Sequence, residues 1–200
     1  MLLNRSGLRA SVVSAMLALS VAIPVAAQNV AKVSAAPRIR IDNFGKINAT
    51  YYRGAQPQGH DYADLAALGV KTVIDLTDDD GEASEPSMVK TAGMQSIKIP
   101  MNGHVAPTSA QLAQFMKIVN DPASQPVYVH CVGGKHRTGV MTAAYRMVHD
   151  GWTSDKAFAE MKQYKFGMDM LHPEFKRFVY NYKPEPKGSV PTVVALTTQQ

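Results

Sequence analysis

Apolar residues recur at helical spacing in six stretches of the chain. Between residues 109 and 120, Leu112, Phe115, Met116 and Val119 fall on one face of a predicted helix. Similar patterns, with glycine or a capping residue at some ends, predict five further helices at residues 62–68, 87–92, 138–148, 154–164 and 172–182. Ser154 is the predicted N-cap of the helix that begins there.

Short apolar runs alternate with these helices. Residues 70–76 contain Val70, Val73, Ile74 and Leu76 and predict a buried strand that ends in an acidic turn. Four more strands are predicted at residues 38–41, 49–53, 96–99 and 127–129. Strands that alternate with helices of this length predict one α/β domain, with a central, mainly parallel sheet flanked by helices.

The first 27 residues have the layout of a secretory signal peptide. Arg5 and Arg9 are their only charges, an apolar run fills residues 10–25, and small residues precede position 28. An uncleaved membrane anchor is the alternative, but the run is short for a span, and the small residues favour cleavage. We therefore expect a periplasmic or secreted protein without a stable membrane anchor. The predicted parts are a signal peptide (1–27), a leader (28–48), a folded domain (49–182) and a flexible tail (183–200).

Composition and charge exclude several classes of protein. With 46% hydrophobic and 18% charged residues, the chain has the composition neither of a disordered protein nor of a multi-span membrane protein. Its formal charge of +5 falls to +3 when Arg5 and Arg9 are removed. That bias is compatible with an anionic ligand, but the chain has no basic stripe with interleaved aromatic residues. Nucleic acid is therefore not an expected partner.

Cys131 is the only cysteine in the chain, so no internal disulfide can form. A lone thiol gives an exported protein no structural benefit, because the use of cysteine in oxidising compartments is to form disulfides. Taken alone, a single cysteine is more often a buried and inert residue than a reactive one. The residues that follow Cys131 favour a chemical role instead.

The segment after Cys131 joins a predicted strand to a predicted helix. Gly133 and Gly134 leave room for backbone amides to turn inward and bind a tetrahedral anion at the helix N-terminus. The same positive field favours the nucleophilic thiolate of Cys131. Arg137 has a planar fork that can hold two phosphate oxygens, and Thr138 can place a hydroxyl near the sulfur. The predicted catalytic residues are Cys131 and Arg137. The predicted substrate-binding set is Val132, Gly133, Gly134, Lys135, His136, Arg137 and Thr138.

This segment resembles a known family signature. His130-Cys131-x-x-Gly134-x-x-Arg137-Thr138-Gly139 is similar to the signature of the protein tyrosine phosphatase superfamily, dual-specificity branch. The likeness is strongest to the atypical plant and fungal members and their bacterial relatives. A second segment, Tyr52-Arg53-Gly54-Ala55-Gln56-Pro57, followed by residues 68–76, resembles the start of the same catalytic domain. The resemblance therefore covers residues 49–182.

The resemblance implies a fold and a mechanism. Members have a parallel sheet flanked by helices, a phosphocysteine intermediate, and neither a metal nor another cofactor. It implies that Cys131 is the nucleophile, that Arg137 clamps the phosphate, and that Thr138 assists hydrolysis of the intermediate. We expect His130 to order the loop through hydrogen bonds, and we interpret Arg53 as part of a structural turn.

The chain departs from the family in the position of the general acid. Members usually carry an aspartate in the loop after the strand predicted at residues 96–99, but residues 101–107 contain no carboxylate. His104 in this loop could donate the proton, because imidazole titrates near neutral pH. An acidic turn is another source, although we expect most of its carboxylates to be solvated: Asp78, Asp79, Asp80, Glu82 and Glu85. The general acid stays unassigned at this point.

The sequence thus predicts an exported cysteine-dependent phosphatase that hydrolyses phosphomonoesters of the phosphotyrosine or inositol-phosphate type. Lys135 and His136 mildly favour a polyanionic substrate. Two alternatives stay open: a phosphate- or phosphoinositide-binding module without turnover and, less favoured, a rhodanese-like sulfurtransferase. The loop of a sulfurtransferase usually has one residue fewer before the basic position. The six histidines lack ligand spacing such as His-x3-His, so no metal site is expected.

Overall fold

A five-stranded sheet forms the centre of the computed structural model, which describes residues 39–184. The predicted signal peptide (1–27), most of the predicted leader and nearly all of the predicted tail lie outside these residues. The strand order is β1-β2-β5-β3-β4, and only the β1–β2 pair is antiparallel. The strands are β1 (Gly45–Lys46), β2 (Tyr51–Ala55), β3 (Thr72–Asp75), β4 (Gln95–Lys98) and β5 (Val127–Cys131).

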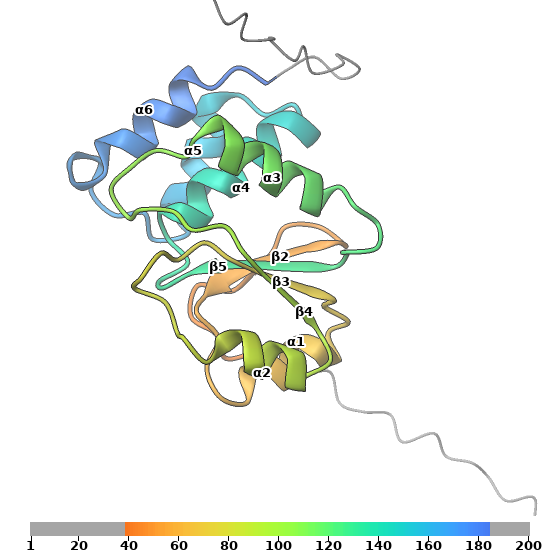
Figure 1. Ribbon diagram of the computed structural model, residues 1–200. Helices are drawn as coiled ribbons and strands as arrows, with labels where there is room; N and C mark the ends of the chain where they lie inside the picture. Colours follow the sequence, from red (N-terminus) through yellow and green to blue (C-terminus); the bar gives the residue numbers. More distant parts are fainter. Residues whose placement is uncertain (1–38, 185–200) are drawn as a thin grey trace, which may run out of the picture. The chain divides into compact units, whose positions relative to one another are not determined.

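Helices cover both faces of this sheet. The helices α1 and α2 lie on one face, and α3, α4, α5 and α6 lie on the other (Figure 1). Their bounds are α1 (Asp61–Ala67), α2 (Glu85–Thr91), α3 (Ser109–Val119), α4 (Arg137–His149), α5 (Ser154–Gln163) and α6 (Pro173–Asn181), and a short 3-10 helix, η1 (Asp169–Leu171), precedes α6. The prediction of an α/β domain with a mainly parallel sheet is confirmed.

Each helical layer has its own hydrophobic core. Phe115 of α3, Met141 of α4 and Phe175 of α6 belong to the larger cluster. Leu65 of α1 and Val89 of α2 belong to the smaller one. Because β5 is an inner strand of the sheet, all five of its residues are buried. The carboxyl end of β5 is consequently held rigidly between the two layers.

Two local predictions were wrong. Residues 39–41 form no strand, because the chain turns at Asp42 and Asn43, and the φ of Asn43 is +58°. The N-cap of α5 is Thr153, not Ser154. Thr153 has extended backbone angles, and its Oγ1 accepts a hydrogen bond from the Lys156 amide at 3.3 Å.

Residues 39–48, which the sequence analysis assigned to the leader, pack on the domain. Within this segment β1 pairs with β2, and the side chains of Ile41 and Ile47 are buried. The folded domain therefore starts by residue 39, earlier than the predicted boundary at residue 49. Among residues 39–184, no helix has both the length and the apolar character that crossing a bilayer requires.

Candidate active site

Cys131 is the last residue of β5, at the carboxyl edge of the sheet. Its side chain is buried, and it lies between β2 and β3, which both run parallel to β5. In open α/β sheets, ligands bind outside the carboxyl ends of the strands. Residues 132–136 then lead directly into α4, so the thiol lies at the start of a strand-to-helix loop, as predicted.

Two side chains hold the carbonyl groups of this loop. The Asn43 Nδ2 donates to the carbonyl oxygens of Gly133, at 3.3 Å, and Gly134, at 3.0 Å. The Arg53 Nη2 also donates to the Gly134 oxygen, at 2.6 Å. Both side chains come from the N-terminal part of the domain and are distant from the loop in sequence.

A backbone contact completes this arrangement, because the Gln56 amide donates to the Val132 carbonyl at 3.1 Å. A trans peptide places its N–H opposite its C=O. With the carbonyls of residues 132–134 bound on one side, the following amides face the other side. Within residues 39–184, the amides of residues 132–136 donate no hydrogen bond. They are therefore available to an anion beside Cys131.

Gly134 is required by this loop. Its φ is +62°, and a Cβ there would overlap the backbone carbonyl of Gly54 in β2. A side chain at Gly54 would in turn meet the Tyr128 hydroxyl. The loop thus lies directly against the β2 backbone, which only glycine permits at both positions.

Arg53 is a buried cation beneath the loop. Its side chain is fully buried, and its guanidinium lies 3.9 Å from the Tyr164 ring centroid. Its Nε and Nη1 have no hydrogen-bond partner. Burial lowers the pKa of Arg53 below its ordinary value, although nearby groups that can carry negative charge, Tyr51 first among them and Cys131 included, oppose this effect. The interpretation of Arg53 as part of a structural turn is wrong, because Arg53 lies in β2 and donates a hydrogen bond to the loop after Cys131.

Arg137 is held at the start of α4 by Asp80. Its Nη1 and Nη2 donate to the two Asp80 oxygens at 2.8 and 2.6 Å, and Nη1 also donates to the Met101 carbonyl at 3.1 Å. A guanidinium has five N–H donors, so Nε–H and one Nη2–H stay free on one edge. Burial acts to lower the pKa of Arg137, but the hydrogen bonds that it donates to Asp80, together with the negative charges of Cys131 and Asp80, raise it above its ordinary value. Arg137 can therefore clamp two phosphate oxygens while it keeps its Asp80 contact.

Two other predicted residues lie beneath the site. The Thr138 side chain is fully buried, and its Oγ1 has no partner. The His130 Nε2 lies 3.0 Å from the buried Glu85 Oε1, although neither His130 nitrogen makes an aligned hydrogen bond. His130 also stacks on Tyr128. His130 is therefore a buried residue of β5 whose ring contacts Glu85 of α2.

A cavity of about 320 Å³ contains the predicted catalytic pair. Cys131, Val132, Gly133, Lys135, His136 and Arg137 line it, together with Asp80, Gly103, His104 and His172. Of the five candidate carboxylates, Asp80 alone lines this cavity. Glu85 is buried against His130, and Glu82 binds Ser84. The structure thus brings together most of the predicted set, and it adds Asp80 and two histidines.

The His136 side chain is oriented by the chain that follows α5. Its Nε2 lies 2.9 Å from the Phe166 carbonyl oxygen, which makes Nε2 the protonated nitrogen in the neutral ring. Partial burial lowers the pKa of His136 below its ordinary value. The ring is therefore a fixed, mostly neutral wall of the cavity at neutral pH.

A second polar cavity of about 340 Å³ adjoins the first. Val132, Gly133 and Lys135 line both cavities. Arg40 and Lys165 add positive charge to the second cavity, while Asp42 and Asp61 add negative charge. The two cavities therefore lie on either side of the same loop.

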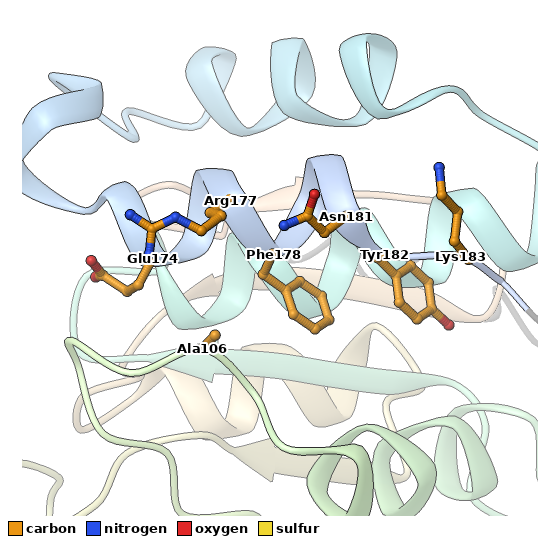
Figure 2. Close-up of a pocket in the computed structure, with 7 residues that line it drawn as sticks. All are labelled: Ala106, Glu174, Arg177, Phe178, Asn181, Tyr182 and Lys183. Atoms are coloured by element: carbon orange, nitrogen blue, oxygen red, sulfur yellow. The ribbon is translucent and has the colours of Figure 1, made fainter.

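Another surface groove, of about 430 Å³, is not the candidate active site. Figure 2 shows that it runs along α6, with Glu174 and Arg177 at one end and Tyr182 and Lys183 at the other. No residue of the Cys131 loop lines it. The chemistry therefore belongs to the smaller cavity at the end of β5.

Comparisons with known proteins agree with this geometry. A family model described as "DSP-PTPase phosphatase fused to NAD+ Kinase" matches residues 24–177. The chain belongs to the DSP-PTPase family. The dual specificity protein phosphatase TpbA of Pseudomonas aeruginosa is 30% identical over 125 residues, which cover 62% of this chain and 56% of TpbA. The inositol diphosphatase SIW14 of Saccharomyces cerevisiae is 27% identical over 130 residues, which cover 62% of this chain and 46% of SIW14. The chain thus spans about half the length of the curated relatives it matches.

Solved structures of both relatives have the same DSP-PTPase fold. The catalytic core of SIW14 in complex with citrate matches with a TM-score of 0.63 at 25% identity, covering 72% of this chain and 88% of that one. TpbA in complex with pTyr matches with a TM-score of 0.60 at 27% identity, covering 70% and 83%. The resemblance inferred from the signature segment is confirmed.

Sequence reasoning missed Asn43, and it gave Arg53 and Asp80 other roles. Asn43 lay in the predicted leader, and Asp80 was one of five equivalent acidic candidates. Arg53 had a signal, because it belongs to the second segment that resembled the family. An arginine inside a strand of otherwise apolar or small residues indicates a buried cation that contacts a polar group elsewhere in the fold.

Proposed function

We propose that this chain is a phosphomonoester hydrolase that works through a phosphocysteine intermediate. The observation that carries the proposal is the loop after Cys131. Its carbonyls are bound on one side, which leaves the amides of residues 132–136 free beside the thiol. Such a nest binds a tetrahedral anion. The names of the relatives support the same reaction, since they include a dual specificity phosphatase and an inositol diphosphatase.

The proposed reaction gives a role to each of three residues. The Cys131 thiolate attacks phosphorus, so an S–P bond forms while the bond from phosphorus to the leaving oxygen breaks. The free edge of Arg137 and the loop amides hold the phosphate oxygens as charge develops. Water then attacks the phosphocysteine, and the S–P bond breaks to release phosphate. We assign assistance of thiolate departure to the Thr138 hydroxyl, which is buried and has no hydrogen-bond partner among the described residues.

We assign the proton donor to His104. The hydrogen bonds from Arg137 lower the pKa of Asp80 to about 2, so this carboxyl is ionised at neutral pH and has no proton to donate. Asp80 is a positioning residue for Arg137. His104 lines the cavity with Cys131, and its imidazole can protonate a leaving oxygen.

The second cavity favours a substrate with more than one phosphate. Lys135 reaches both cavities, and Arg40 and Lys165 lie in the second. A substrate that extends from the first cavity past the loop would bring further anionic groups to these cations, whose charge Asp42 and Asp61 offset only in part. SIW14 is named an inositol diphosphatase, while TpbA has been solved with pTyr. We therefore rank an inositol phosphate above phosphotyrosine as the class of substrate.

Export is also proposed, on the pattern of residues 1–27. Arg5 and Arg9 precede an apolar run and a small-residue cleavage site. The mature protein would act in the periplasm or outside the cell. N-terminal sequencing of the protein recovered from the producing cell tests this, since cleavage would leave Gln28 as the first residue.

Hydrolysis of p-nitrophenyl phosphate, with reductant and chelator present, tests the reaction. Wild-type protein should turn over, Cys131→Ser should not, and acid-quenched wild type should carry one phosphoryl group on Cys131. Phosphate binding without any burst of product would favour the binding-only alternative. Sulfur transfer from thiosulfate to cyanide would favour the sulfurtransferase, which the family assignment already opposes.

The role of His104 is tested by varying the leaving group. His104→Asn should lower kcat for phenyl phosphate by about 100-fold. The loss should be far smaller for p-nitrophenyl phosphate, because its leaving group needs no proton. An equal fall in kcat on both substrates would show that His104 is not the proton donor.

A further inference from the structure

Three potential metal ligands meet beside the active-site cavity, and two of them line it. His104, His172 and Glu174 each offer one ligand atom, and these atoms all lie within 4.8 Å of one another. His104 belongs to the loop after β4, whereas His172 and Glu174 belong to the start of α6. The cluster therefore exists only in the folded chain.

The ligands are ordered by their own contacts. The His172 Nδ1 lies 3.2 Å from the Glu174 Oε1, and the side chains of His172 and Glu174 are 14% and 20% exposed. The His104 ring stacks on the His172 ring, with centroids 5.1 Å apart and planes 15° from parallel. His104 itself is exposed, so an ion from solvent can reach the cluster.

The neighbouring groups limit what the cluster can hold. The His136 ring lies 3.7 Å from the His172 ring, but its Nε2 is engaged with the Phe166 carbonyl oxygen. Arg177 lies close to Glu174 at the same end of the α6 groove (Figure 2). The protein thus supplies three ligands, and the fourth position of a tetrahedral ion would be open.

We propose that His104, His172 and Glu174 form a regulatory zinc site that closes the active-site cavity. Two imidazoles and one carboxylate are a ligand set that Zn²⁺ favours, whereas Mg²⁺ and Ca²⁺ prefer oxygen ligands alone. His104 and His172 also line the cavity that contains Cys131, so an ion held between them would occupy the wall of that cavity. The bound ion inhibits hydrolysis and takes no part in it.

Sequence reasoning expected no metal site because it considered ligands at short spacing. Here 68 positions separate His104 from His172, and the fold alone joins them. The inhibitory effect rests on the proposed phosphatase function, whereas zinc binding itself does not.

Binding is tested on the full chain carrying Cys131→Ser, which removes the thiolate as a competing ligand. Titration calorimetry with Zn²⁺ should show one ion bound per chain. Adding Glu174→Gln or His172→Asn should weaken binding by about tenfold or more. His60→Asn is the matched control, since His60 is exposed on α1's N-terminal side and lies outside the cluster. Circular dichroism melts show whether each variant is folded.

Co²⁺ gives a second readout that needs no activity. In Cys131→Ser the cobalt-loaded protein should show the visible bands of a tetrahedral site, and Glu174→Gln should weaken them. No Zn²⁺ binding by Cys131→Ser would overturn the proposal, because the thiol would then be the site. Unchanged affinity in both Glu174→Gln and His172→Asn would overturn it as well.

Inhibition is then measured with Cys131 intact. Zn²⁺ should inhibit p-nitrophenyl phosphate hydrolysis, and chelator should reverse the inhibition. Relative to each variant's own rate without zinc, Glu174→Gln should need at least tenfold more Zn²⁺ for the same inhibition. If the wild type has no turnover, the phosphatase function fails while the binding titration still decides the zinc site.

Discussion

Arg53 is a buried residue that positions the site although its burial does not stabilise the fold. Its charge is fully buried, two of its nitrogens have no partner, and its one hydrogen bond goes to the Gly134 carbonyl. Replacing a buried charge with an apolar side chain of similar size is often neutral or stabilising. The fold therefore does not need the guanidinium, whereas the loop does.

We expect Arg53→Met to separate activity from stability. Without the bond to Gly134, the loop amides lose their alignment, and a displacement of about 1 Å can cost about 100-fold in rate. kcat/KM should therefore fall by about 100-fold, while the melting temperature stays the same or rises. Arg53→Lys, which keeps the charge but not the fork, should also lose activity. Full activity in Arg53→Met would show that Gly134 is held by other contacts.

Asp80 acts through its charge, and its effect on stability should depend on pH. Because the pKa of Asp80 is lowered from 3.8 to about 2 by Arg137, ionised Asp80 stabilises the folded state above pH 4. This contribution is lost as the pH falls through 2. Asp80 is 46% exposed, so the effect should be below about 1 kcal/mol.

Melting curves of wild type and Asp80→Asn should test this. Wild type should be the more stable at pH 7, and the difference should shrink as the pH falls from 4 towards 2. Between pH 5 and 8, the pH profiles of kcat/KM should keep the same shape in both proteins. A profile that loses one limb in Asp80→Asn would instead make Asp80 the proton donor.

The residues that could be predicted are those next to one another in sequence. Cys131, Gly134 and Arg137 lie in one short loop, so their spacing alone indicated the chemistry. Asn43 and Arg53 contact that loop only because β2 lies beside β5 in the sheet. No local pattern encodes which strands are neighbours, so those roles needed the structure.

At the scale of elements, the decisive feature is the close contact between the Cys131 loop and β2. Gly134 has a positive φ, and its α-carbon faces the Gly54 backbone without room for a methyl group. Gly133 differs, because a Cβ there would meet only the Lys135 side chain, at 3.6 Å. Gly133 therefore provides a control for a substitution at the adjacent Gly134.

Gly134→Ala should be severely damaging. Backbone strain and overlap with β2 should together lower the free energy of unfolding by about 3 kcal/mol or more. Gly133→Ala should change it by less than about 1 kcal/mol, as measured by urea unfolding of both proteins. Equal stability of the two variants would mean that the loop can move away from β2.

The order of helices and strands could be predicted well, whereas their ends could not. The helix predicted at residues 109–120 is α3, Ser109–Val119, because its apolar spacing is regular and Thr108 closes a capping box with Gln111. The strand β1 has only two residues, too few for any alternation to show. Short elements form because a neighbour is present, and the neighbour is not visible in the local pattern.

At the scale of the whole described domain, segments far apart in sequence converge on one loop. Asn43 contacts the loop from before β1, Arg53 from β2, and Asp80 contacts Arg137 from the turn after β3. Asn43 also donates to the Tyr164 carbonyl at 2.8 Å, which ties the chain after α5 to the same point. The site is therefore a property of the assembled sheet and its helices.

The segment from residue 39 to residue 48 should be indispensable for this assembly. Ile41 and Ile47 are each 7% exposed, and burying such a side chain stabilises a fold by about 1.5–3 kcal/mol. A chain that begins at residue 49 should therefore melt at least about 10 °C below one that begins at residue 39. Its kcat/KM should also fall by about tenfold or more, because Asn43 is missing from the loop.

Asn43→Ala in the longer chain separates the two effects. It leaves the isoleucines in place, so the melting temperature should fall by only a few degrees, while kcat/KM falls by about tenfold because two loop carbonyls lose their donor. If the chain from residue 49 melts and turns over like the chain from residue 39, the domain begins where the sequence pattern placed it. The contacts of residues 39–48 would then be dispensable additions to a complete fold.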